Sequence, residues 1–347
     1  MPTFAPRPTP RPIAATLVAV ALAGALAAAP AGGQAVRNLA GLRANTLQAN
    51  DDGSTGLDGA APGTGLVSFG FANPLNFFGA TYGGAYVNNN GNITFTAPQR
   101  TFTPFGLTTT LGTPIIAPYF ADVDTRGPSG RGSGDGAGNA GNAAQTYDGS
   151  GLVTYGTTTV NGRAAFGVNY FSDCAAWTGA GAGPGCAGFA GSNGLVGVGY
   201  FDGGTNLRNI FQVLLIDRSD VAAGDFDIEY NYNQVQWETG DASGGANGRG
   251  GQSARVGFSN GTGAAGSFFE LAGSGVNGAF LDGGPAGSRL TGNSRNSAVL
   301  GRYVFSVRAG RPDVIVPEPE TWALVAGGLV VVAAVGRRRA AGGAVAL

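Results

Sequence analysis

Residues 225–232 alternate strictly between polar and apolar side chains, and this pattern excludes most folds. The segment reads Asp-Phe-Asp-Ile-Glu-Tyr-Asn-Tyr, so its aromatic and aliphatic side chains share one face and its polar side chains share the other. A period of two belongs to a half-buried β-strand and cannot produce the apolar stripe of a helix. The segment is therefore predicted to be a strand with one buried and one solvated face.

The middle of the chain shows the same signals repeatedly. Residues 211–216 are almost continuously apolar, as expected of a central strand that is buried on both faces. Asn90-Gly91 and Asn161-Gly162 lie between apolar segments, and both predict β-hairpins because Asn-Gly tolerates positive φ at both turn positions. Further strands are predicted at 66–71, 115–120, 152–157, 164–170, 254–258 and 302–307.

Between the two ends, no segment keeps a helical period over three turns. The predicted fold is an all-β, antiparallel, sandwich-like domain with long Gly-rich loops. The 64 glycines supply the turns, while 12% charged and 10% aromatic residues indicate a packed core and not disorder. Two loops, 127–149 and 237–251, are predicted to present backbone groups and Trp237 to a ligand.

The N-terminal residues are typical of an export signal. Arg7 and Arg11 precede an uncharged apolar run over 13–29, and small residues follow. This order predicts a signal peptide over 1–35, with an apolar helix and with cleavage after Ala31 or Ala35; a permanent membrane anchor is the alternative. Export machinery is therefore an expected partner. A polar, turn-rich segment over 36–65 then leads to the β domain over 66–310.

Residues 311–347 combine a proline-rich motif, a short apolar stretch and a basic end. The apolar stretch is predicted to be a short transmembrane helix, and the arginines after it should hold that end in the cytoplasm with the β domain outside. The motif comprises Val316, Pro317, Glu318, Pro319 and Trp322, and the basic end comprises Arg337, Arg338 and Arg339.

Together, these three features resemble the PEP-CTERM sorting signal of Gram-negative bacteria. The resemblance implies that an exosortase-type processing enzyme in the membrane recognises and removes the tail. It also implies transient inner-membrane anchoring through the C-terminal helix, followed by delivery to the cell surface or to the biofilm polysaccharide. The alternative is an ordinary short membrane anchor.

Four segments of the β domain resemble the nidogen-like (NIDO) domain of animal extracellular matrix proteins. They cover 77–82, 86–95, 114–126 and 211–237, and the block from 121 to 126, Ala-Asp-Val-Asp-Thr-Arg, is the most specific. The resemblance spans roughly 66–308 and implies extracellular matrix association and cell-matrix adhesion. A matrix polysaccharide or a surface protein is then the expected partner. The sequence lacks the cysteine-rich modules that accompany the domain in animals, so partners reached through those modules do not carry over.

The residue inventory excludes several chemistries. Without histidine or lysine, the chain cannot form a Ser-His-Asp or Cys-His arrangement, a histidine-ligated zinc site or a lysine Schiff base. Its 20 basic residues are all arginine and are scattered, so no basic stripe for nucleic acid is expected. Cys174 and Cys186 are predicted to form a disulfide after export, which would stabilise the domain by about 3 kcal/mol; two free thiols are the alternative.

Carboxylates remain as candidate functional groups. Calcium takes hard oxygen ligands in turn-rich loops, and two aspartate clusters offer them, although their spacing does not match an EF-hand and aspartates in such turns often bond their own backbone. The candidate calcium ligands are Asp51, Asp52 and Asp58 in the first cluster and Asp122 and Asp124 in the second.

A glycosidase needs only two carboxylates, and pairs such as Asp122 with Asp124, or Asp225 or Asp227 with Glu229, are available. A row of acids at alternate positions is more often the solvated face of a strand. The sequence therefore predicts a non-enzymatic, exported protein that acts in adhesion or matrix association. The alternatives are a calcium-dependent glycan-binding module and a carboxylate glycosidase.

Overall fold

The computed structural model describes residues 1, 34–47, 50–56, 65–125, 153–173, 194–200 and 207–314. Their strands pair antiparallel, and their helical elements are short 3-10 turns: η1 (Ala40–Arg43), η3 (Asp241–Ser243) and η4 (Leu290–Gly292). The prediction of an all-β, antiparallel fold is confirmed. Among the described residues, no helix has the length and apolar character needed to cross a membrane.

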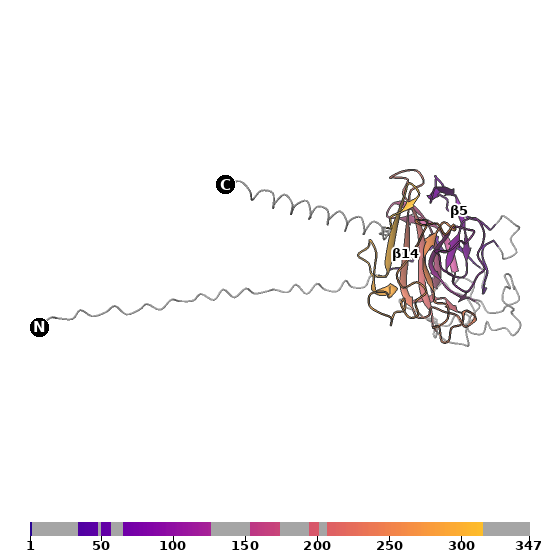
Figure 1. Cartoon of the computed structure of the whole chain (residues 1–347). Coiled ribbons are helices and arrows are strands. Elements are labelled where there is room, and N and C mark those ends of the chain that lie inside the picture. The colour runs from indigo at the N-terminus through magenta and orange to yellow at the C-terminus, as the bar shows by residue number, and fades with distance from the viewer. Residues whose placement is uncertain are drawn as a thin grey trace, which may run out of the picture. The chain divides into compact units, whose positions relative to one another are not determined.

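Two large sheets form the domain, and strands β14 and β5 mark them in Figure 1. The larger sheet runs β1-β9-β10-β13-β14-β17-β18, and β11 pairs with β10 beside this path. Its strands are β1 (Asn45–Thr46), β9 (Val153–Val160), β10 (Arg163–Asp173), β11 (Leu195–Gly197), β13 (Asn209–Asp217), β14 (Phe226–Val235), β17 (Arg302–Arg308) and β18 (Arg311–Pro312).

The second sheet has the order β16-β15-β7-β6-β5-β2, and two small two-stranded sheets, β3-β4 and β12-β8, accompany it. Its strands are β2 (Val67–Ser68), β5 (Gly84–Asn88), β6 (Asn92–Thr94), β7 (Ile115–Phe120), β15 (Arg255–Ser259) and β16 (Phe268–Glu270). The small sheets comprise β3 (Leu75–Phe77), β4 (Ala80–Tyr82), β8 (Val123–Asp124) and β12 (Gly199–Tyr200).

Aromatic side chains fill the space between the two large sheets. The Tyr230 hydroxyl donates across it to the carbonyl oxygen of Gly257 at 2.7 Å, and the rings of Phe258 and Phe305 meet edge to face at 5.4 Å. Each fully buried side chain of this size contributes about 1.5–3 kcal/mol of hydrophobic free energy. The core therefore lies where two aromatic sheet faces meet, as in a β-sandwich.

Both predicted hairpins are present. Asn161 and Gly162 have φ of 50° and 79°, and Val160 pairs with Arg163 across them, so the turn is the two-residue type that Asn-Gly favours. In the other hairpin Asn88 pairs with Asn92, which leaves a three-residue connection over 89–91 where Asn-Gly alone suggests two.

β14 is the predicted alternating strand, but its polar face is not solvated. Phe226, Ile228 and Tyr230 point into the core as expected. Glu229 on the opposite face is only 3% exposed and Asn231 is fully buried. The prediction of a half-buried strand is wrong on this point, because other parts of the chain cover the outer face of the larger sheet.

One polar side chain from each of five neighbouring strands forms a row across this outer face. Each member lies opposite the next in the strand register. Side-chain hydrogen bonds of 2.6 to 3.0 Å connect them. We call this row the ladder, and its members are Thr154, Asn169, Gln212, Asn231 and Arg302.

Residues 35–43, here called the strap, lie over the ladder. The backbone N–H and C=O of Arg37 each make a 3.0 Å hydrogen bond with the Gln212 amide. Leu42 is fully buried in an apolar cluster with side chains from β9, β10 and β13. The strap therefore gives the buried ladder its remaining hydrogen-bond partners and covers apolar surface beside it.

Trp237 does not present itself to a ligand. Its side chain is fully buried, its ring meets that of Tyr119 edge to face at 6.1 Å, and its indole N–H donates to the Val198 carbonyl oxygen at 3.1 Å. The prediction that this ring lies exposed in a binding loop is wrong. It is a core side chain at the start of the 237–251 loop.

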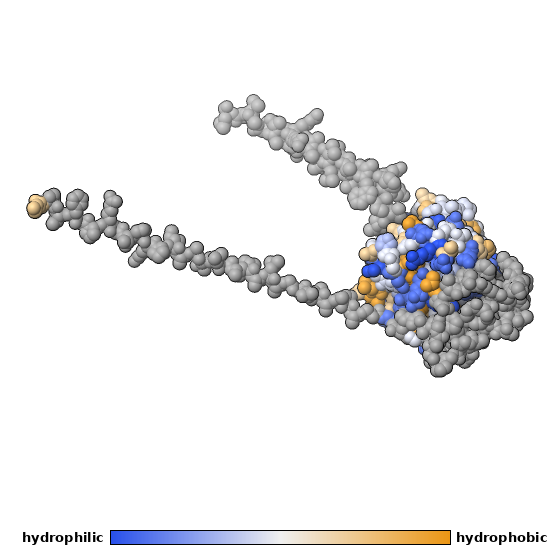
Figure 2. All heavy atoms as spheres, turned by 90° about the horizontal axis from the view of Figure 1, so that it is seen from below, coloured by the Kyte–Doolittle hydropathy of each residue, from blue (hydrophilic) through white to orange (hydrophobic). Residues whose placement is uncertain are grey.

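Figure 2 shows one face of the domain, on which hydrophilic and hydrophobic residues are interspersed. Apart from Met1, the exposed large apolar side chains of the described residues come from separate segments: Leu66, Val221, Val276 and Leu300. Several predictions fall outside the described residues. The predicted apolar signal helix, the 127–149 loop, Cys174, Cys186 and the sorting tail from Val316 to Arg339 stay predictions.

Candidate metal centre

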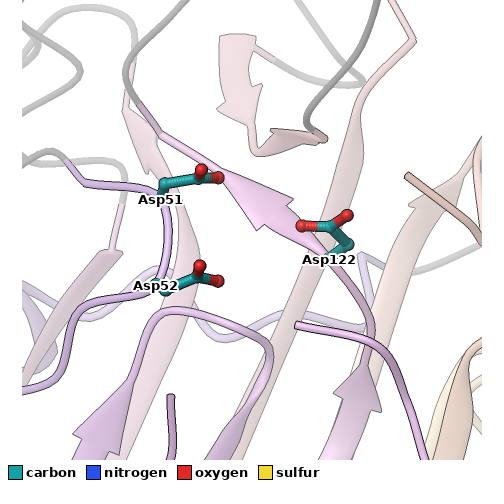
Figure 3. A group of neighbouring side chains, drawn as sticks. All are labelled: Asp51, Asp52 and Asp122. Carbon is teal, nitrogen blue, oxygen red and sulfur yellow. The ribbon is translucent and has the colours of Figure 1, made fainter. Parts of the chain in front are cut away.

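Asp51, Asp52 and Asp122 form a group of buried carboxylates. One oxygen from each lies within 4.8 Å of the others, and the residues are 9%, 5% and 2% exposed. Figure 3 shows the carboxylates of Asp51 and Asp52 facing that of Asp122. The structure thus unites members of two clusters that are far apart in the sequence.

The β5-β6 turn holds the two segments together. The Asn89 amide nitrogen donates to the backbone oxygens of Asp51 and Val123. The Asn90 amide donates to the Asp52 carboxylate and accepts from the Val123 backbone N–H, both at 2.9 Å. Two consecutive asparagines therefore bind both acidic segments at once.

Asn89 is fully buried, and its amide oxygen has no hydrogen-bond partner among the described residues. A buried polar atom without a partner costs about 1–3 kcal/mol. An amide oxygen is also a common calcium ligand. Asn89 thus adds an oxygen of the right chemical type in the immediate surroundings of the acidic group.

The loop after β14 packs closely on the third carboxylate. A Cβ on Gly240 would lie 2.3 Å from an Asp122 carboxylate oxygen, so any larger residue would displace that side chain. The Ser243 hydroxyl is 3.4 Å from the same oxygen. Glycine at 240 therefore lets a third segment approach the group.

Three ionised carboxylates this close repel one another, and burial raises the cost of each charge. A cation among them relieves both effects. Oxygens bound to calcium lie about 2.3–2.6 Å from the ion, so they can be up to about 5 Å apart, and the three carboxylate oxygens, all within 4.8 Å of one another, satisfy this limit. The residues present therefore fit calcium.

The remaining candidate acids lie elsewhere. Asp124 is half-buried in β8 and does not belong to the group, and Asp58 lies outside the described residues. Glu229 accepts two hydrogen bonds from Arg37, at 2.7 and 3.0 Å. Asp227 accepts hydrogen bonds from two other arginines. Glu229 and Asp227 are therefore both neutralised by ion pairs with arginine.

Comparison with known proteins indicates the family to which part of this chain is similar. A model of the nidogen-like domain matches residues 84–138 and 196–309. This chain contains a nidogen-like domain. The match includes Asp122 and the Asn89-Asn90 turn, whereas Asp51 and Asp52 precede it in the sequence. The nidogen-like domain therefore supplies one carboxylate, and the segment before the match supplies the other two.

The chain is also similar to two α-tectorins. It is 30% identical to the human protein over 209 residues and 30% identical to the mouse protein over 212 residues. Each alignment covers 58% of this chain but only 8% of the tectorin, so the chain spans less than a tenth of the length of these relatives. No solved structure matches the chain significantly.

A second buried acid in the nidogen-like domain predicts a pH dependence of stability. Glu238 is fully buried, and one of its oxygens has no hydrogen-bond partner among the described residues. Desolvation raises the pKa of this carboxyl above its ordinary 4.5. The folded state thus holds a proton that the unfolded state releases, and stability falls as pH rises from 4.5 through the raised pKa.

Replacing Glu238 with Gln removes this charge without changing the side-chain shape. We expect the variant to be more stable than the parent at pH 8, and the difference to vanish near pH 4. Urea unfolding at both pH values measures it, and the comparison within each pH cancels other titrating groups. A variant that is less stable at pH 8 would show that the ionised form is stabilising.

Proposed function

We propose that this chain is an exported protein that attaches cells to an extracellular matrix through its nidogen-like domain. The match to that domain carries the proposal, and the similarity to α-tectorin supports it. The predicted export signal over 1–35 would deliver the domain outside the cytoplasm, where such contacts form. The expected partner is a matrix polysaccharide or a surface protein.

The C-terminal residues support a surface or matrix location. The motif Val316 to Pro319, the apolar stretch and the arginines would anchor the chain in the inner membrane until an exosortase-type enzyme removes the tail. The domain would then act in biofilm, on the cell surface or in the secreted polysaccharide. Many copies on one surface would raise avidity even if each contact is weak.

The arrangement of the acids supports binding over catalysis. Each acid of the glycosidase pair in β14 is paired with arginine, and Asp122 is buried with two other aspartates. A calcium-dependent glycan-binding module is the second candidate function. The three converging carboxylates favour it, because calcium held there would order the loops that carry them.

Deleting the gene from its host should weaken attachment to matrix or aggregation of cells, and the complete chain should restore it. A chain that ends at residue 314 should be exported but not retained at the surface, so it should restore attachment poorly. Attachment in flow and immunoblots of cell and medium fractions measure both effects. Unchanged attachment after deletion would contradict the adhesive function.

A further inference from the structure

A polar pocket of about 240 Å³ lies on the outer face of the larger sheet, beside the strap. Its lining residues include three arginines, Arg37, Arg163 and Arg302, and two acids, Asp227 and Glu229. The described residues that line it include no aromatic ring. None of its lining residues belongs to the aspartate group, and nothing in the proposed function assigns the pocket a role.

Arginine neutralises both carboxylates of the pocket. Glu229 accepts two hydrogen bonds from Arg37, and its carboxylate lies 3.4 Å from the Arg302 guanidinium. Asp227 accepts hydrogen bonds of 2.9 and 2.6 Å from two arginines outside the lining. The oxygens of both acids are thus engaged, and the pocket offers few acceptors to a ligand.

Hydrogen-bond donors, in contrast, are in surplus. A guanidinium carries five N–H donors. Arg37 uses two on Glu229, and Arg302 uses one on Asn231 and one on the Ala35 carbonyl oxygen. Among the described residues, Arg163 donates only to Asp220, and its buried Nε has no partner there. More than half of the donors on these three groups therefore have no acceptor in the described part of the chain.

We propose that this pocket binds one carboxylated sugar unit of an acidic matrix polysaccharide. Unused guanidinium donors fit an anion rich in acceptors, and their planar fork matches a carboxylate in particular. Hydroxyl groups of the sugar can reach Asn161, Asn296 and Ser297, which also line the pocket. The proposal rests on the proposed function for the choice of a polysaccharide as the partner.

The shape and lining favour this ligand over two others. A neutral sugar ring packs its apolar face on an aromatic side chain, and the described lining has none. A larger anion such as a nucleotide would exceed the volume, since pockets for drug-sized ligands measure about 300–1,000 Å³. A single charged sugar unit fits both the non-aromatic lining and the volume of the pocket. The rest of the polymer would extend into solvent.

Calorimetric titration of the purified mature chain with trigalacturonate, against maltotriose as the neutral match, tests the proposal. We expect binding of the acidic trisaccharide only. Arg163→Gln should weaken it about tenfold or more, because it removes the least engaged guanidinium. This variant should fold, since the Arg163–Asp220 pair is exposed and contributes little stability. Val304→Phe should weaken binding without a change of charge by filling the pocket.

Arg100→Gln is the matched control, because it removes one exposed arginine outside the pocket and should bind like the parent. Equal affinity for maltotriose, or unchanged binding by both pocket variants, would overturn the proposal. Absence of trigalacturonate binding would also overturn it. If gene deletion still weakens attachment in that case, only the pocket assignment fails and the adhesive function stands.

Discussion

Excess chelator should lower the melting temperature of the domain by about 3 to 10 °C relative to millimolar calcium. The reason is linkage: calcium at roughly 10 to 100 times its dissociation constant stabilises the folded state by about 1.4 to 2.7 kcal/mol. A domain of this size shifts by about 2 to 4 °C per kcal/mol. Without the ion, Asp51, Asp52 and Asp122 repel one another in a buried site.

The Asp122→Asn variant distinguishes a calcium ligand from a residue that only supports the fold. It should abolish the calcium response and, in chelator, leave the domain at least as stable as the parent, because one of three repelling charges is gone. Asp313→Asn, outside the group, should keep the full response. Calorimetric scans of the three proteins with and without calcium measure it, and equal stabilisation by magnesium would contradict a calcium centre.

Gln212→Leu should lower the free energy of unfolding by about 3 kcal/mol or more. The Gln212 amide contacts Asn169, Asn231 and both backbone groups of Arg37. Leucine has nearly the same size but leaves the Asn169 amide oxygen and the Arg37 backbone N–H without their partner, at about 1–3 kcal/mol each. It also removes one hydrogen bond each from Asn231 and the Arg37 carbonyl oxygen, which keep Glu229 and Leu39 as partners. The ladder and the strap should therefore loosen together.

Urea unfolding followed by tryptophan fluorescence measures this loss, since Trp237 is buried in the core. Gln99→Leu is the control, because within the described residues the Gln99 side chain makes a single hydrogen bond, from the Thr101 backbone N–H, and its loss should cost little. Limited proteolysis adds a local readout, with cleavage within the strap expected first. A loss below about 1 kcal/mol in the Gln212 variant would show that the ladder is not needed to hold the strap.

Local patterns in the sequence predicted the elements that depend on neighbouring residues. The Asn161-Gly162 hairpin and the strand at 225–232 follow from turn chemistry and from a period of two, and both are confirmed. The outer face of that strand did not follow, because Glu229 and Asn231 are buried by a strap almost 200 residues away. An alternating pattern indicates that one face of a strand is buried, but it does not show whether a distant segment covers the other face.

The aspartate group at the candidate site also depends on contacts between distant segments, which local patterns do not predict. The sequence marked Asp51, Asp52 and Asp122 as calcium candidates, but it placed them in two separate clusters. Their meeting depends on Asn89 and Asn90, which bind both segments from the β5-β6 turn. The run of three asparagines at 88–90 was the available signal for these two residues, since such side chains can satisfy backbone groups from several segments.

The strap also sets an order of assembly. It lies near the start of the described domain, yet its contacts lie far along the chain: the Ala35 carbonyl oxygen accepts from Arg302, 267 residues later. Contacts of such separation form late and slowly. The domain therefore cannot complete its outer layer until β17 is in place. The strap thus closes the fold, and its contacts with β17 are expected to form late in folding.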